Sequence, residues 1–226
     1  MIVNGFVSNK VRSTNIQYVV WYICTTPFFL GGSMIHFVDV ETTGLDPRKH
    51  EIIEICIMTQ YPNGKTKTFY TKIKPSNIED ADPRALAING FDMEVWKGAN
   101  LFANVAPMII DNLQGGVIVG HNVAFDIAFI REELERAGVK VPRLRGIDTV
   151  TLAHEHLAPL GLTSLSLDSI RKFLGWTTKN AHTANKDTND TRMLYNLLLR
   201  CKWYTRITIL LKHKIGLLLA KCKGVI

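Results

Sequence analysis

Apolar and polar residues are arranged along residues 34–199 in patterns that predict a closely spaced series of strands and helices. Short runs rich in β-branched residues predict strands, whereas apolar residues three or four positions apart predict helices. The strands are expected at residues 35–41, 51–61, 66–73, 117–120 and 145–148. The helices are expected at residues 84–87, 92–97, 101–112, 124–137, 149–157, 164–174 and 187–199.

The first three predicted strands follow one another directly, with a Pro-Asn-Gly-Lys turn at residues 62–65 between the second and the third. This spacing predicts an antiparallel meander. Helices and strands alternate after the meander, as they do where strands pair through helical crossovers. The sequence therefore predicts an α/β fold with a mixed sheet and helices on both faces.

The net charge of +7 lies in the two flanks of the chain rather than between them. Residues 1–33 carry +2 and residues 200–226 carry +7, in both cases without an acidic residue, whereas residues 34–199 carry −2. A mildly acidic domain can still bind nucleic acid if divalent ions occupy some of its carboxylates. At 226 residues the chain has room for one α/β domain with short extensions.

Residues 1–33 are expected to be a leader or an over-extended translation start outside that domain. An apolar stretch at residues 18–30 follows Lys10 and Arg12, so a targeting segment is the alternative. Four cysteines occur without a Cys-x-x-Cys pair, which indicates neither a zinc ribbon nor a disulfide framework. A reducing, cytoplasmic compartment is therefore expected.

Residues 200–226 interleave seven basic residues with aromatic and aliphatic ones, which predicts a basic amphipathic tail. Such a tail could dock on a DNA polymerase subunit, contact nucleic-acid phosphates or, the least expected case, lie on an anionic membrane. A last helix packed on the domain, with its lysines solvated, is the alternative of equal weight.

Two carboxylates, Asp39 and Glu41, end the first predicted strand. Side chains alternate along a strand, so residues two apart project from the same face. Neighbouring carboxylates at the end of a buried strand repel each other and need a cation, for which oxygen ligands favour Mg²⁺ or Mn²⁺. Two solvated acids at a strand end are the structural alternative.

Further carboxylates stand at two later junctions. Asp126 lies in the first turn of the helix that follows the strand at 117–120, and Asp187 lies at the start of the last helix, five residues after His182. Ligand sites in open α/β sheets collect at the carboxyl ends of strands, so these side chains can face one crevice. Each acid alone could instead complement a helix dipole or cap a helix.

Together the four carboxylates and His182 lie in segments whose order and spacing resemble the three motifs of the DEDDh family of 3′-to-5′ exonucleases. The proofreading epsilon subunit of bacterial DNA polymerase III is a member of this family. The segments are Asp39-x-Glu41-Thr42-Thr43-Gly44, His121-Asn122-x-x-Phe125-Asp126 and His182-x-Ala184-x-x-Asp187. The resemblance extends over residues 34–199 and implies a ribonuclease H-like fold, a five-stranded mixed sheet whose first three strands are antiparallel.

The resemblance also implies a site with two Mg²⁺ or Mn²⁺ ions. Asp39, Glu41 and Asp187 would bind one ion, Asp39 would bridge to the second, and Asp126 would hold that second ion. His182 would act as the general base that takes a proton from the attacking water. The residues expected to contact the terminal nucleotide are Val40, Thr42, Thr43, Asn89 and His121. Asn89 stands where family members with DNA substrates often have histidine, so it can form a hydrogen bond there but cannot carry charge.

The function implied is metal-dependent release of nucleotides from single-stranded 3′ ends of DNA, in proofreading or repair. An exoribonuclease acting on short RNA or RNA 3′ ends is the alternative, because the 2′-hydroxyl contacts that distinguish the two cannot be read from one sequence. A non-catalytic nucleic-acid-binding module is the most remote alternative, because all five catalytic residues of the motifs are present.

Overall fold

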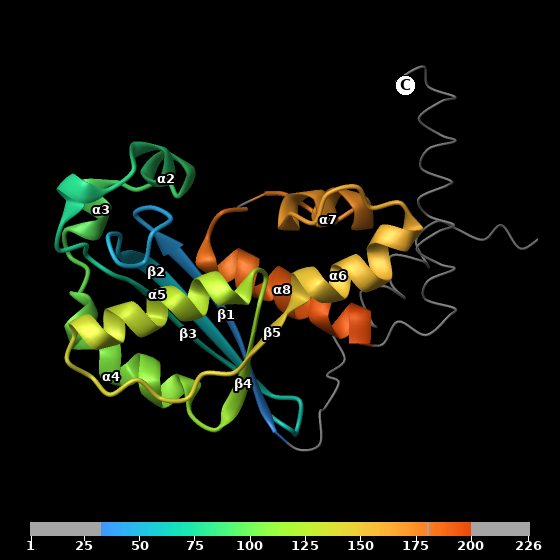
Figure 1. Cartoon of the computed structure of the whole chain (residues 1–226), viewed down its shortest axis with the longest axis horizontal. Helices are drawn as coiled ribbons and strands as arrows, with labels where there is room; N and C mark the ends of the chain where they lie inside the picture. Colours follow the sequence, from blue (N-terminus) through green and yellow to red (C-terminus); the bar gives the residue numbers. More distant parts are fainter. Residues whose placement is uncertain (1–32, 180, 200–226) are drawn as a thin grey trace, which may run out of the picture.

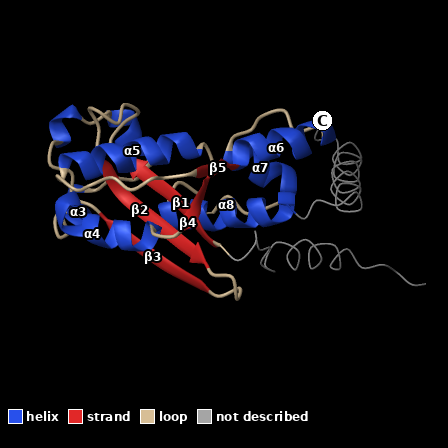
Figure 2. Cartoon of the chain, turned by 60° about the horizontal axis from the view of Figure 1, so that its bottom comes forward, coloured by secondary structure: helices blue, strands red, loops and turns tan. Residues whose placement is uncertain are grey.

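The computed structural model describes residues 33–179 and 181–199, which form a mixed sheet covered by helices on both faces (Figures 1 and 2). The five strands lie in the order β3-β2-β1-β4-β5. β1 pairs antiparallel with β2 and parallel with β4, β2 pairs antiparallel with β3, and β4 pairs parallel with β5. The strands are β1 (Met34–Thr42), β2 (Ile52–Gln60), β3 (Thr66–Lys72), β4 (Gly116–Gly120) and β5 (Gly146–Asp148). The predicted five-stranded mixed sheet, with its antiparallel meander, is confirmed.

The helices occur in the predicted order, and the main differences lie at their ends. The α-helices are α2 (Pro83–Ile88), α3 (Met93–Trp96), α4 (Phe102–Leu113), α5 (Val123–Arg136), α6 (Thr149–Leu157), α7 (Leu167–Leu174) and α8 (Ala184–Leu199), and two 3₁₀ turns, Ile78–Asp80 and Ala158–Leu160, add to them. α7 begins later than predicted because the Ser166 hydroxyl caps it by accepting a hydrogen bond from the backbone N–H of Ser169. α8 begins earlier, at Ala184, which places Asp187 in its first turn.

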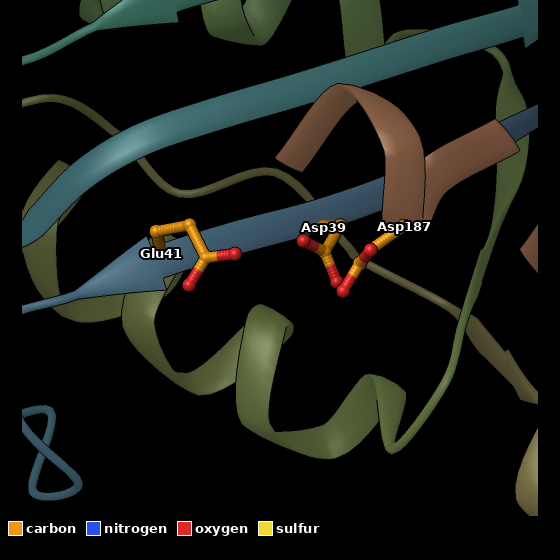
Figure 3. A group of neighbouring side chains, drawn as sticks. All are labelled: Asp39, Glu41 and Asp187. Carbon is orange, nitrogen blue, oxygen red and sulfur yellow. The ribbon is translucent and has the colours of Figure 1, made fainter. Parts of the chain in front are cut away.

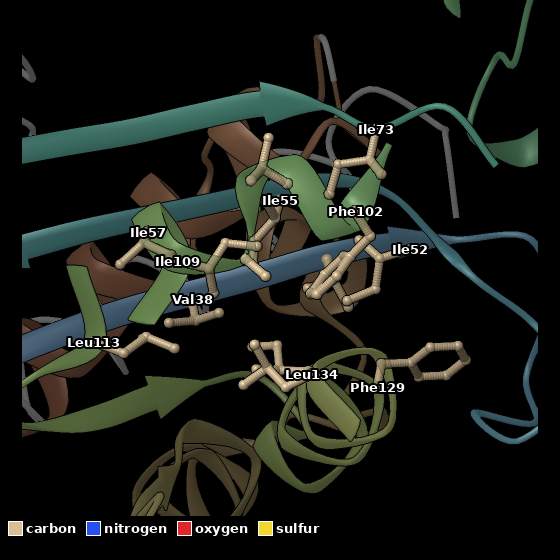
Figure 4. Packing of buried hydrophobic residues seen from close by; sticks show 14 of the residues in the cluster. Val38, Ile52, Ile55, Ile57, Ile73, Phe102, Ile109, Leu113, Phe129 and Leu134 are labelled. Carbon is tan, nitrogen blue, oxygen red and sulfur yellow. The ribbon is translucent and has the colours of Figure 1, made fainter. Parts of the chain in front are cut away.

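The alternation of side chains along β1 decides what each face of the sheet packs against. Val38 and Val40 join a core with residues of α4 and α5, part of which is drawn in Figure 4. Ile35 and Phe37 face the other way, toward Tyr195 of α8, with the Phe37 and Tyr195 ring centroids 5.6 Å apart. Odd-numbered residues of β1 thus face α8, and the same alternation continues to the end of the strand.

The parallel pairing of β1, β4 and β5 brings their carboxyl ends to one edge of the sheet. α5 follows β4 and α6 follows β5 at that edge. Motif residues that are far apart in sequence can therefore meet there, which is the condition for a shared site.

Several predictions concern parts of the chain outside the described residues. They are the leader at residues 1–33, of which only Ser33 is described, the amphipathic tail at residues 200–226, and three of the four cysteines. The fourth, Cys56, is a buried free thiol. Every helix in residues 33–179 and 181–199 is too short or too polar to span a bilayer.

Candidate active site at the carboxyl end of strand β1

Three of the predicted carboxylates lie together at the end of β1. Asp39 and Glu41 project from the same face of the strand, and Asp187 approaches them from the first turn of α8 (Figure 3). Each residue offers one oxygen, and these three oxygens lie within 4.8 Å of one another. The local reason is the strand period of two, combined with the packing of α8 on the face of the sheet that Phe37 also faces.

The fourth carboxylate, Asp126, is buried next to β1 in the first turn of α5. Its Oδ1 accepts a hydrogen bond from the backbone N–H of Val40, at 3.1 Å. Val40 lies between Asp39 and Glu41 in sequence, so this bond ties the second motif to the first. Besides burial, the charge of Asp126 raises the pKa of Asp39, as expected for neighbouring carboxylates.

Burial and mutual repulsion hold protons on this cluster when no cation is bound. Burial raises the pKa of Asp39 well above its ordinary value, and the charges of Asp126, Glu41 and Asp187 add to the rise. Burial also raises the pKa of Glu41 to about 8, with contributions from Asp187 and Glu54. For Asp187, burial raises the pKa against the opposing effect of Arg171. At neutral pH the cluster without a cation therefore keeps some of its carboxyl groups protonated.

A hard divalent ion fits this set of residues. Three carboxylates within 4.8 Å of one another supply the oxygen donors that Mg²⁺ and Mn²⁺ prefer. A bound cation would also remove the repulsion that raises the carboxylate pKa values. Asp39, Glu41 and Asp187 are thus the residues that could hold a metal, with Asp126 adjacent to them.

We expect the protein without metal to lose stability as the pH rises from about 4.5 to about 8, because the folded state retains a proton on Glu41 that the unfolded chain has already released. Stability falls with rising pH wherever the folded state binds more protons, so the loss is complete above the folded-state pKa. Thermal unfolding in EDTA should show a Tm lower at about pH 8 than at about pH 5, by about 5 °C. Mg²⁺ at the higher pH should reverse much of the loss.

Glu133 adds a separate part to this pH dependence, because burial raises its pKa to about 7. Its Oε1 accepts hydrogen bonds from Arg136 and from the Ile52 backbone N–H. Glu41→Gln separates the two groups: it should remove the contribution of Glu41 to the part of the profile that Mg²⁺ reverses and leave the contribution of Glu133. A Tm in EDTA that does not depend on pH, or one that Mg²⁺ leaves unchanged, would contradict the assignment.

His182, the predicted base, lies beside Asp168 of α7. Its Nε2 is 3.4 Å from Asp168 Oδ2, and about half of its side chain is exposed. Its backbone is left-handed, with φ of 62°; Asn122 of the second motif, with φ of 71°, is the other non-glycine residue with positive φ in residues 33–179 and 181–199. Such backbone strain is frequent at functional sites.

Two threonines predicted to contact substrate use their hydroxyl groups inside the protein. Thr42 Oγ1 donates to the Gly44 carbonyl at 2.7 Å, and Thr43 Oγ1 accepts from the Glu51 N–H at 2.9 Å. Both side chains are buried. The N–H of Val40 is likewise engaged by Asp126. A nucleotide would therefore have to meet other atoms of residues 40–43, so these contacts stay predictions.

Asn89 and His121 also have partners within the protein. Asn89 Nδ2 donates to the Thr42 carbonyl at 2.9 Å, which holds the segment after α2 against the first motif. For His121, Nδ1 lies 2.9 Å from Thr149 Oγ1 and Nε2 lies 2.8 Å from the Leu165 carbonyl oxygen. Both ring nitrogens of His121 are thus used, and burial lowers its pKa. These partners favour a positioning role for both residues, and their contact with substrate stays a prediction.

Two charged residues next to the carboxylate cluster, Glu54 and Arg171, lie outside the three motifs, so the motifs did not predict them. Glu54 of β2 lies opposite Glu41 in the sheet register and pairs with Lys72, whose Nζ lies 3.4 Å from the Trp96 ring centroid. Arg171 of α7 binds Asp187. A signal for Arg171 was present in the sequence, because it shares the spacing of the apolar residues of its helix. Two of its partners, Asp187 and Asp190, belong to α8 and could not be read from that spacing.

Comparison with known proteins gives a match over most of the chain. The RNase T family model, described as Exonuclease, matches residues 37–197. A PolC-type DNA polymerase III of Thermotoga petrophila is 33% identical over 159 residues, which are 70% of this chain and 11% of the polymerase. The 3′-5′ exonuclease DinG of Bacillus subtilis is 28% identical over 159 residues, 70% of this chain and 17% of DinG.

A relative of more similar length is the ribonuclease T of Shewanella frigidimarina, 27% identical over 189 residues, 74% of this chain and 81% of that protein. The fold resembles the Escherichia coli Exonuclease I solved in complex with a dT13 oligonucleotide, with a TM-score of 0.66. That likeness covers 74% of this chain and 41% of Exonuclease I at 21% identity. The predicted ribonuclease H-like fold is thereby confirmed.

Proposed function

The chain belongs to the DEDDh exonuclease family, and from this membership we propose that it is a metal-dependent 3′-to-5′ exonuclease that releases nucleotides from DNA ends. One observation of the site carries the proposal. Asp39, Glu41 and Asp187, which come from two separate elements, place carboxylate oxygens within 4.8 Å of one another. A cluster of this kind is unstable without a cation and suits phosphodiester hydrolysis with one.

We propose Mg²⁺ as the metal, with Mn²⁺ as a substitute, and two ions per site. Asp39, Glu41 and Asp187 would hold one ion, while Asp39 and Asp126 would hold the second. The ions would supply positive charge where negative charge develops on the phosphate and on the leaving oxygen. The buried position of Asp126 and its bond to the Val40 N–H support this division, because they fix Asp126 beside Asp39.

His182 is proposed as the general base. Asp168, 3.4 Å from Nε2, favours a proton on that nitrogen and so leaves Nδ1 with the lone pair that accepts a proton from the attacking water. The exposure of the His182 side chain supports this role, since a base must reach a water held between protein and substrate.

The terminal nucleotide is proposed to bind between residues 42–45 and the end of α2. Asn89 joins these segments through its bond to the Thr42 carbonyl. Leu45 and Ile88 belong to these segments, and their side chains are 78% and 61% exposed. Exposed apolar side chains beside a phosphodiester site are available to contact an unstacked base.

DNA is the proposed substrate, with RNA 3′ ends as the alternative. The relatives include a PolC-type DNA polymerase III and a ribonuclease T, which support one substrate each. A non-catalytic binding module has less support, because the motif carboxylates and His182 are all present.

A matched pair of oligonucleotides tests the substrate. DNA and RNA of the same single-stranded sequence, labelled at the 5′ end, are incubated with the protein and Mg²⁺, and the shortened products are resolved by length. We expect a ladder that shortens from the 3′ end, with kcat/KM at least about tenfold higher for DNA. A tenfold preference for RNA would select the alternative, and no shortening of either strand would reject both.

We further propose that the exonuclease domain comprises residues 34–199, in agreement with the matched range 37–197. Residues 200–226 are proposed to contact a DNA polymerase or the nucleic acid, on the grounds of their basic, amphipathic sequence. The free thiol of Cys56 is in keeping with the reducing, cytoplasmic compartment that we propose.

A further inference from the structure

Arg171 is the largest of the fully buried side chains that the structure describes. Each nitrogen of its guanidinium group donates to a different carboxylate. Nε donates to Asp190 Oδ2 at 2.7 Å, Nη1 to Asp168 Oδ1 at 2.7 Å, and Nη2 to Asp187 Oδ1 at 2.6 Å. The side chain thus connects α7, which carries Arg171 and Asp168, to α8, which carries the other two acids.

A buried guanidinium is costly unless it is both neutralised and fully hydrogen-bonded. Three acids around one arginine exceed what neutralisation requires, and Lys186 adds a second cation at Asp190. On α8, Asp190 lies about one turn after Asp187, and Lys186 directly precedes Asp187. The planar fork of Arg171 holds all three carboxylates in fixed directions, which a lysine ammonium cannot do.

Two of the three carboxylates that Arg171 binds belong to the candidate active site or contact a residue of it. Asp187 belongs to the cluster with Asp39 and Glu41, and Arg171 engages only its Oδ1, which leaves Oδ2 without that donor. Asp168 accepts from Arg171 through Oδ1, while its Oδ2 lies 3.4 Å from His182 Nε2. One guanidinium therefore contacts a candidate metal ligand and the partner of the candidate base.

We propose that Arg171 is a positioning residue of the active site: it fixes the direction of the Asp187 carboxylate for a divalent ion and, through Asp168, the position of His182. The proposal rests on the proposed function only in the roles that Asp187 and His182 have there. A purely structural tie between α7 and α8 is the competing explanation, and it requires no effect on metal binding.

Arg171→Lys tests the metal part, because it keeps the positive charge and removes the fork. Asp190→Asn is the matched control: it alters the same buried network but leaves the bonds from Arg171 to Asp187 and Asp168. Isothermal titration calorimetry with Mn²⁺, without nucleic acid, measures metal affinity directly, and thermal unfolding in EDTA measures the structural effect.

We expect both variants to lower Tm by about 5 °C, and only Arg171→Lys to weaken Mn²⁺ binding, by about tenfold, as for partners that orient metal ligands. Asp190→Asn should bind Mn²⁺ within about twofold of the wild type. Mn²⁺ affinity of Arg171→Lys equal to that of the control would overturn the metal part of the proposal.

Asp168→Ala tests the other part, and it also serves if Arg171→Lys does not fold, because the Asp168 side chain is 38% exposed. We expect kcat on single-stranded DNA to fall by about tenfold while KM and Mn²⁺ affinity stay within about twofold. An unchanged kcat would overturn the connection from Arg171 to His182.

Failure of this proposal can be told from failure of the proposed function. A wild-type protein that binds Mn²⁺ but cleaves neither DNA nor RNA would refute the function, while the titrations would still decide the role of Arg171 toward the metal. A wild-type protein that cleaves DNA, together with an Arg171→Lys variant that binds Mn²⁺ normally, would refute the role of Arg171 alone.

Discussion

Replacing Asp39 with asparagine is expected to lower the rate of Mg²⁺-dependent hydrolysis of single-stranded DNA by on the order of 10⁴-fold. The carboxylates are proposed to bind the metal ions jointly, so the loss of one of them disables the whole site. Asp39 is the residue assigned to both proposed ions. Burial raises its pKa, and the charges of Asp126, Glu41 and Asp187 add to the rise. The measurement is the initial rate of nucleotide release at saturating Mg²⁺.

The same substitution should leave the fold intact. In the protein without metal, Asp39→Asn removes an ionisable group from a repelling cluster, so Tm in EDTA at about pH 8 should stay equal or rise. Asp111→Asn, at an exposed position on α4, is the matched control and should change neither quantity. Substantial activity in Asp39→Asn, or a variant that is unfolded in EDTA, would contradict the site assignment.

His182→Ala is expected to lower kcat by about 10² to 10⁴-fold, the usual effect of removing a general base. KM for DNA should change little, because the side chain is assigned to proton transfer rather than to binding. Single-turnover cleavage measures the chemical step directly, and added imidazole should restore part of the lost rate in this variant.

His154→Ala provides the control, since His154 is an exposed histidine on α6 and lies outside the three motifs. It should cleave DNA at the wild-type rate and show no response to imidazole. If His182→Ala cleaves as fast as this control, His182 is not the base.

The sequence predicted those parts of the site that depend on the period of a single element. The alternation along β1 places Asp39 and Glu41 on one face, and the observed packing of Phe37 toward α8 agrees with it. The parallel strands β4 and β5 also followed from the order of predicted elements. Such features depend on the periodicity of apolar and polar residues within one short segment, which can be read directly from the sequence.

The sequence did not predict contacts between side chains of separate elements. The hydroxyl of Thr43 is occupied by a backbone N–H near the start of β2, and Asn89 by a carbonyl at the end of β1. Arg171 lies on the apolar side of its helix, yet Asp187 and Asp190 become its partners only when α7 packs on α8. No single segment of the sequence specifies such partners, so the residues that surround the carboxylate cluster could be identified only from the structure.

The most direct test of the central claim is metal-dependent cleavage at the carboxylate cluster. The protein is freed of metal with EDTA, incubated with single-stranded DNA labelled at the 3′ end, and then supplied with Mg²⁺. The account predicts no release of label before Mg²⁺ and release of labelled mononucleotide after it, with no release at any stage for Asp39→Asn. Equal release in EDTA, or release by Asp39→Asn at the wild-type rate, would contradict it.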